Sequence, residues 1–134
     1  MQNITLILDS NEYIFGFKDK NSPSASLLAK NKFFKLKIPL IIIEEVDRNL
    51  SRDLQKKFYQ FIRDHAEVIF ELPPEELLEK YRAKGLKNAD SLIGAYCEFL
   101  SVDFLISENR HFLSDFNPKA FKVLSASDFL RQFP

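Results

Sequence analysis

The chain has 134 residues, of which 46% are hydrophobic and 28% charged, a length and balance typical of one globular domain. Its single cysteine, Cys97, excludes an intrachain disulfide and a cysteine-based zinc site, so we expect a reducing, cytoplasmic setting. The formal net charge is zero, which argues against nucleic-acid binding through a global positive field. A nucleic-acid ligand would need a local basic patch or metal ions.

The first part of the chain predicts a strand and a helix. Residues 4–8 are rich in branched apolar side chains and are followed by Asp9, a pattern typical of a strand that runs into a turn. Ser22 can cap a helix and Pro23 suits its first position, so we expect this helix to continue over residues 24–34. The residues before Asp9 contain no basic segment, which predicts that no secretory signal is present.

The middle of the chain repeats the strand-to-helix pattern. The fully apolar run 38–43 predicts a second strand, and apolar residues at helical spacing predict one or two helices over 44–64, broken near Ser51. Residues 67–72 predict a third strand, and a helix follows from Pro74 to Gly85. All apolar runs are far shorter than the roughly 18 residues that a membrane span needs, so we expect no membrane segment.

The last part of the chain completes the pattern. Asn88 can cap a helix over residues 89–100, strands are predicted at 103–107 and 121–124, and residues 127–133 predict a short closing helix. Strands that alternate with helices indicate a mostly parallel sheet covered on both faces. We therefore predict one α/β domain over residues 1–134, folded as a three-layer α/β/α sandwich.

Polar residues follow the predicted strands. Asp9 ends the first strand, Glu44 and Glu45 end the second, and Asn109 follows the fourth, while Asp90 lies in the first turn of the helix that leads into the fourth. Ligands of open α/β sheets bind outside the carboxyl ends of the strands, so we expect these side chains to converge. Asp9 could instead be only a turn or capping residue, and Asp90 only a first-turn acid.

Such a cluster restricts the chemistry. Carboxylates held close together repel each other unless a cation lies between them. Oxygen ligands without histidine or cysteine favour Mg²⁺ or Mn²⁺ over zinc. A metal-bound water can attack a phosphodiester while the metal neutralises charge on the leaving oxygen.

Four segments, in order, resemble the motifs of the PIN-domain family: 7–11 (Ile-Leu-Asp-Ser-Asn), 45–50 (Glu-Val-Asp-Arg-Asn-Leu), 88–95 (Asn-Ala-Asp-Ser-Leu-Ile-Gly-Ala) and 103–112 (Asp-Phe-Leu-Ile-Ser-Glu-Asn-Arg-His-Phe). No single motif is specific, but the ordered set covers nearly the whole chain. The resemblance implies a five-stranded sheet of order 3-2-1-4-5 and Mg²⁺- or Mn²⁺-dependent ribonuclease activity. It also implies service as the toxin of a VapBC-type toxin–antitoxin pair, with a small antitoxin protein as partner.

The resemblance carries over a set of site residues. The catalytic residues become Asp9, Glu45, Asp90 and Asn109, of which the first three are metal ligands. Asn109 stands where many members have a second aspartate, and its amide can contact a metal or its water without adding charge. The supporting residues become Ser10, Asn11 and Ser107, with the two hydroxyls as candidates to hold metal waters or a phosphate oxygen. We assign the ligand role to Glu45 and not Glu44 because the family pattern matches there.

Other residues have weaker functional interpretations. Basic residues near the predicted site, as candidates for binding RNA phosphates, are Arg82, Lys84, Lys87 and Arg110. Asp103 is interpreted as a structural turn residue and Cys97 as a buried hydrophobe. Fourteen phenylalanines exceed what a small core needs, which indicates an interface, either in a homodimer or with the antitoxin. The alternative function is a PIN-fold module that binds RNA or protein with weak or no catalysis; a phosphoacceptor function of Asp9 ranks last.

Overall fold

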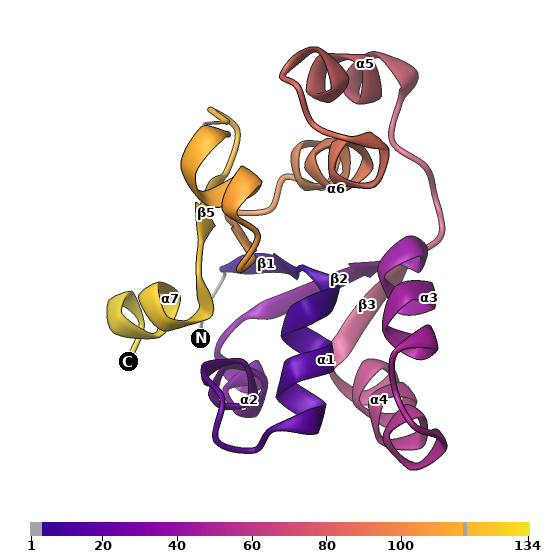
Figure 1. Ribbon diagram of the computed structural model, residues 1–134, viewed down its shortest axis with the longest axis vertical. Helices are drawn as coiled ribbons and strands as arrows, with labels where there is room; N and C mark the ends of the chain where they lie inside the picture. The colour runs from indigo at the N-terminus through magenta and orange to yellow at the C-terminus, as the bar shows by residue number, and fades with distance from the viewer. Residues whose placement is uncertain (1–3, 117) are drawn as a thin grey trace.

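The computed structural model describes residues 4–116 and 118–134, and its centre is a five-stranded parallel sheet (Figure 1). The strands are β1 (Thr5–Leu8), β2 (Lys35–Pro39), β3 (Ala66–Ile69), β4 (Phe104–Ile106) and β5 (Lys122–Leu124). Their order is β3-β2-β1-β4-β5, and every neighbouring pair is parallel. Both the predicted parallel sheet and the strand order are confirmed.

Helices cover both faces of this sheet. They are α1 (Ser10–Lys18), α2 (Pro23–Ala29), α3 (Leu40–Arg48), α4 (Arg52–His65), α5 (Glu75–Ala83), α6 (Asn88–Phe99) and α7 (Ala126–Gln132), with a 3₁₀ turn η1 (Asn31–Phe33) and a π-helical turn η2 (His111–Asp115). Figure 1 shows α1, α2, α4 and α7 on one side of the sheet and α5 with α6 on the other. This arrangement confirms the three-layer sandwich. No helix among residues 4–116 and 118–134 is long and apolar enough to cross a membrane.

The second strand lies earlier than predicted. It ends at Pro39, which pairs with Ile69, and the apolar run that follows is the start of α3. A short apolar run does not distinguish a buried strand from a buried helix, and here the side chains of Ile42 and Val46 are buried at helical spacing. Proline lacks an N–H and fixes φ near the helical value, so it suits this junction. Glu45, which was predicted to follow the strand at the start of a helix, therefore lies in the second half of α3.

Helix α1 replaces the turn that was predicted after Asp9. The Asp9 carboxylate accepts a hydrogen bond from Ser10 N at 2.9 Å and caps the helix. Aromatic residues and Gly16 give this segment a poor intrinsic helix propensity, but tertiary burial compensates. The Tyr13 ring is fully buried and meets Phe58 of α4 edge-on, with ring centres 5.5 Å apart. Contacts distant in sequence thus stabilise α1.

Two predicted helix starts are confirmed and one is wrong. The hydroxyl of Ser22 caps α2 by accepting from Ala25 N at 3.0 Å, although α2 ends at Ala29 and not at residue 34. Ser51 caps α4, which confirms the break. Asn88, however, is the first residue of α6, the cap position is Lys87, and the Lys87 side chain makes no capping hydrogen bond.

The remaining boundaries differ by a few residues from those predicted. Strand β3 ends at Ile69, three residues before the predicted end, and leaves Phe70 and Leu72 exposed. Helix α5 ends at Ala83, and Gly85 follows with φ of +90°, a conformation that favours glycine after a helix. The central strands form the core, and Cys97 of α6 is fully buried as expected.

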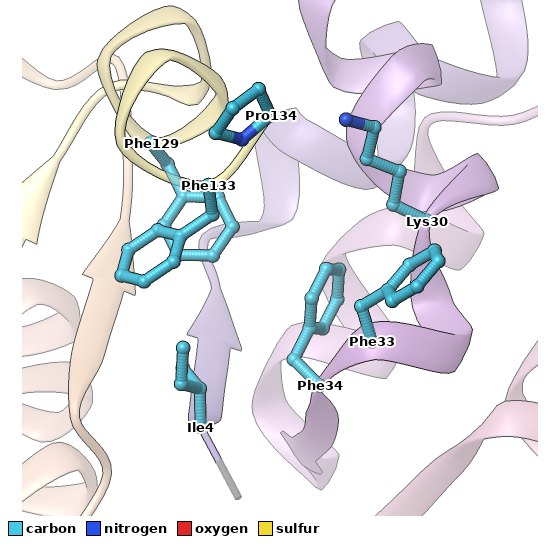
Figure 2. A pocket seen from close by; sticks show the side chains of 7 residues that line it. All are labelled: Ile4, Lys30, Phe33, Phe34, Phe129, Phe133 and Pro134. Carbon is cyan, nitrogen blue, oxygen red and sulfur yellow. The ribbon is translucent and has the colours of Figure 1, made fainter. Parts of the chain in front are cut away.

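An apolar cavity of about 140 Å³ lies near the amino ends of β1 and β2 (Figure 2). Its lining residues are Ile4, Lys30, Phe33, Phe34, Phe129, Phe133 and Pro134. Figure 2 shows the rings of Phe33 and Phe34 on one wall and those of Phe129 and Phe133 on the opposite wall. The lining contains no Asp or Glu side chain, and the cavity lies at the end of the sheet opposite Asp9, so it is separate from the predicted acidic site.

Candidate active site

Asp9 stands at the centre of the candidate site because β1 ends and α1 begins there. Its backbone N–H donates to Ile106 O at 2.9 Å, which links the carboxyl ends of β1 and β4. Its side chain is buried, with 8% of the residue exposed. One carboxylate oxygen accepts from Ser10 N, and the other accepts from the hydroxyl of Ser107 at 2.8 Å. Two strands and one helix therefore fix this carboxylate.

Helix α3 brings Glu45 to the same place. The Ser10 hydroxyl donates to Glu45 Oε1 at 2.7 Å and also lies 3.5 Å from Asp9 Oδ1. Glu44, one residue earlier, is exposed and lines a groove on another side of α3. The structure thus places Glu45, and not Glu44, beside Asp9, although the helix that carries it begins at Leu40 and not at residue 44 as predicted.

Asp90 and Asn109 complete a continuous network. The Asn109 backbone N–H donates to the Ser107 hydroxyl at 3.0 Å, and its side-chain Nδ2 approaches Asp90 Oδ2 at 3.5 Å. Asp90 lies in the first turn of α6. Hydrogen bonds therefore connect residues from four separate segments, in the order Glu45, Ser10, Asp9, Ser107, Asn109 and Asp90.

The electrostatics of this network favour a cation. Burial raises the pKa of Asp9, the bonds from Ser107 and Ser10 lower it, and the nearby charges of Asp90 and Glu45 raise it again. The donors of these hydrogen bonds are hydroxyl and amide groups, which bring no positive charge to the carboxylates. A positive ion would relieve the repulsion among them.

The carboxylates do not surround one point. Among residues 4–116 and 118–134, no three Asp, Glu, His or Cys side chains are close enough together to hold one metal ion. The donor chemistry nevertheless fits a hard divalent cation, since every candidate ligand atom is a carboxylate or amide oxygen. The Ser10 and Ser107 hydroxyls lie between these carboxylates and donate to them.

Sequence reasoning missed a second acidic pair next to this site. Glu12 of α1 is fully buried; its Oε1 accepts from the Ser24 hydroxyl at 2.8 Å, and its Oε2 has no hydrogen-bond partner within the described chain. The Glu108 carboxyl faces it, and burial together with this acid raises the pKa of Glu12 to about 8. Glu108 also accepts from Ala126 N at the start of α7, at 3.0 Å. The signal in the sequence was an acid on an otherwise apolar helix face.

The predicted phosphate-binding residues differ in their surroundings. Arg82 pairs with Glu75 and Glu79, each at 3.4 Å, on the exposed side of α5. Lys87 is exposed and directly precedes the helix turn that holds Asp90. Lys84, also exposed, follows α5, and Arg110, likewise exposed, follows Asn109. Of these four, Lys87 and Arg110 are nearest in sequence to residues of the network.

Two further residues are placed clearly. Asn11 is exposed on α1 and is not part of the hydrogen-bonded network described above. Asp103 Oδ2 accepts from Thr5 N at 2.8 Å, so it holds the start of β1 and has the structural role that was expected.

The fold is that of chains in two solved VapBC complexes. The structure resembles a chain of VapBC2 from Rickettsia felis bound to a DNA fragment from its promoter, with a TM-score of 0.67, 19% identity, and coverage of 90% of this chain and 97% of the other. It also resembles a chain of DNA-bound VapBC from Salmonella typhimurium, with a TM-score of 0.66, 17% identity, and coverage of 92% and 98%. No protein-family profile and no curated protein sequence matches the chain. These likenesses confirm a PIN-like fold.

Proposed function

We propose that this protein is a metal-dependent ribonuclease and the toxin of a toxin–antitoxin pair. The observation that carries the proposal is the network that joins Asp9, Glu45, Asp90 and Asn109 at the carboxyl edge of the sheet. The likeness to chains of VapBC complexes supports the toxin–antitoxin part. A small antitoxin protein is then the expected partner.

The acidic residues would hold the metal. Asp9, Glu45 and Asp90 offer three carboxylates, and Mg²⁺ or Mn²⁺ typically takes one or two carboxylates, waters and substrate phosphate oxygens. When bound, such an ion supplies Lewis-acid stabilisation of the phosphate and a more acidic water. Asn109 adds a polar group without charge, so the site carries three negative charges where an aspartate at residue 109 would give four.

The two serines would orient these carboxylates. The Ser107 hydroxyl donates to Asp9 and accepts from Asn109 N, which fixes its direction. The Ser10 hydroxyl lies between Asp9 and Glu45 and donates its shorter bond to Glu45. Fixed hydroxyls reduce the rearrangement that is needed when a ligand binds, which is how supporting groups sharpen a metal site.

The substrate would reach the site beside basic side chains. Lys87 and Arg110 flank the network in sequence, and their charges would attract RNA phosphates. Arg82 is a weaker candidate than Lys87 because two glutamates already pair with it. With zero net charge, local charges of this kind would have to supply the attraction.

A second candidate function is a module of this fold with weak or no catalysis. The Asn109 side chain favours it, because Oδ1 already accepts from His111 N at 3.0 Å and Nδ2 faces Asp90. In this arrangement the amide oxygen is engaged and does not face the carboxylates. Such a module would still bind RNA or its protein partner.

Cleavage of labelled RNA by the purified protein tests the proposal. We expect cleavage with Mg²⁺ or Mn²⁺, none with a chelator, and loss of activity in Asp9→Asn. Asp53→Asn, an exposed acid on α4, is the matched control and should cleave like the parent. Absence of cleavage with either metal, together with retained RNA binding, would select the inactive module.

A further inference from the structure

The cavity of Figure 2 has no part in the acidic network, and its walls are largely aromatic. The rings of Phe34 and Phe129 meet edge-on with centres 5.8 Å apart, which joins the two walls. The rings of Phe129 and Phe133 lie 4.8 Å apart, and Ile4 and Pro134 extend the apolar lining. Because these ring contacts fix the walls, the cavity is a preformed site for an apolar group.

The volume of the cavity sets the size of that apolar group. Its volume of about 140 Å³ is close to that of an apolar protein cavity of roughly 150 Å³ that binds benzene. One aromatic ring would therefore fill it and supply the packing contacts that its walls lack. Phe33 lines the cavity although 60% of the residue is exposed, so its ring borders the opening through which a ligand would enter.

Lys30 is the charged side chain among the residues that line this cavity. It directly follows α2 and is half-buried. Figure 2 shows it on the wall of Phe33 and Phe34, with its ammonium nitrogen directed toward Pro134. Lys30 forms no ion pair with any acid of residues 4–116 and 118–134. A half-buried ammonium without a counter-ion favours a negatively charged group beside it.

Further positive charge borders the cavity. Lys32 and Lys35 are both exposed, and each is adjacent in sequence to a phenylalanine of the lining. Asp103 lies at the same end of the sheet, where its carboxylate accepts from Thr5 N at 2.8 Å. Three lysines in six consecutive residues, 30–35, attract an anion to this opening even though the whole chain has no net charge.

We propose that this cavity binds a small carboxylate that carries one aromatic ring, with the ring between Phe34 and Phe133 and the carboxylate beside the Lys30 ammonium. The volume and the aromatic walls define the ring, and the unpaired ammonium defines the negative charge. Ring-to-ring contacts and a charge-assisted hydrogen bond would hold the ligand. The site does not depend on the proposed function, since the cavity and the acidic network lie at opposite ends of the sheet.

Titration of the purified full chain with phenylacetate, followed by amide NMR spectra, tests the site. We expect saturable binding with a Kd below about 1 mM, and chemical-shift changes that cluster at Ile4, Lys30 and Phe33. Phenylethanol, which has the same ring without the charge, should bind about tenfold more weakly. Absence of saturation, equal affinities for the two compounds, or shift changes centred away from the lining residues would overturn the proposal.

Two variants separate the roles of charge and ring. Lys30→Met keeps an unbranched apolar side chain, so the Kd of phenylacetate should rise about tenfold while that of phenylethanol stays within about twofold. Phe33→Ala removes an exposed wall of the cavity and should weaken both compounds. Lys56→Met, on the exposed side of α4, is the control and should bind like the parent. Unchanged phenylacetate binding in Lys30→Met would contradict the proposal; circular dichroism verifies that each variant is folded.

Discussion

At the scale of single residues, Asp9 combines burial with neighbouring negative charge. Burial is the largest cause that raises its pKa, and the Ser107 hydroxyl is the strongest influence in the opposite direction. A proton and a metal ion compete for the same carboxylate. Binding of a divalent cation should therefore weaken as pH falls through the raised pKa of Asp9.

Replacing Ser107 with alanine should shift the pH at which binding of the divalent cation weakens. The variant loses the hydrogen bond that stabilises the ionised form of Asp9, so the pKa rises further and Mn²⁺ binding weakens at a higher pH than in the parent. Calorimetric titration of Mn²⁺ over a pH series measures the pH midpoint at which Mn²⁺ binding is lost. Ser127→Ala, an exposed hydroxyl on α7, is the control. Equal midpoints in Ser107→Ala and the parent would contradict this explanation.

Glu12 gives a pH dependence of the folding stability. Its pKa is raised from 4.5 to about 8 in the folded protein, so the folded state keeps a proton that the unfolded state releases. Stability from this group is complete below pH 4.5 and is lost as pH rises toward 8, at up to about 1.4 kcal/mol per pH unit. Glu12→Gln removes the titrating group and keeps an amide that can bond to Ser24 and Glu108.

Urea unfolding of Glu12→Gln and the parent, from pH 5 to 9, measures this difference. We expect the variant to gain stability relative to the parent as pH rises, with little further change above pH 8. Glu71→Gln, an exposed acid beyond β3, should follow the parent throughout. Parallel curves for Glu12→Gln and the parent would show that Glu12 is already ionised in the folded protein.

At the scale of secondary structure, the sequence predicted which elements exist better than where they begin. Alternation of apolar runs with helical periodicity was enough for the parallel sheet, and Ser22 and Ser51 marked two helix starts. The run after Pro39 fits a strand or a helix equally well, and only packing decides between them. Helix α1 was missed for a related reason, since its stability comes from contacts such as Tyr13 with Phe58.

The candidate site was predictable where its residues lie at the ends of strands or helices. Asp9 and Asp90 occupy a strand end and a first helical turn, both visible in the sequence. Glu45 was chosen through a family pattern and contacts Ser10, although its helix begins at Leu40 and not at residue 44. The pair of Glu12 and Glu108 joins residues 96 positions apart through burial, so periodicity alone could not predict it.

Packing of α5 on α6 gives a prediction at this scale. A Cβ on Gly94 would lie 2.8 Å from Tyr81 Cδ1, and the Tyr81 hydroxyl donates to Glu98 at 2.7 Å, which holds the ring. Gly94→Ala should therefore lose about 1–3 kcal/mol of unfolding free energy, despite the better helix propensity of alanine.

Thermal or urea unfolding of Gly94→Ala measures this loss. Gly16→Ala is the matched control, because its Cβ would meet the flexible end of Leu28 and should cost less. A Gly94→Ala variant as stable as the parent would mean that the tyrosine ring moves freely away.

At the scale of the whole molecule, the protein has no formal net charge, and the polar side chains of the candidate site lie at one end of the sheet. The acidic network lies at the carboxyl ends of β1 and β4, the apolar cavity near the amino ends, and the exposed groove on the β3 side. The acidic network and the apolar cavity lie at opposite ends of the sheet, so variants can test each without disturbing the other. The central claim is that the acidic network performs metal-dependent RNA cleavage.

The rate of RNA cleavage under single-turnover conditions with Mn²⁺, compared between Glu45→Gln and Glu44→Gln, tests that claim most directly. The two substitutions make the same chemical change on consecutive residues of α3, and only Glu45 contacts the Ser10 hydroxyl. Loss of a ligand that stabilises transition-state charge should slow Glu45→Gln about a hundredfold or more, while Glu44→Gln should stay within about threefold of the parent. Equal rates for the two variants, whether both fast or both slow, would contradict the assignment of catalysis to this network.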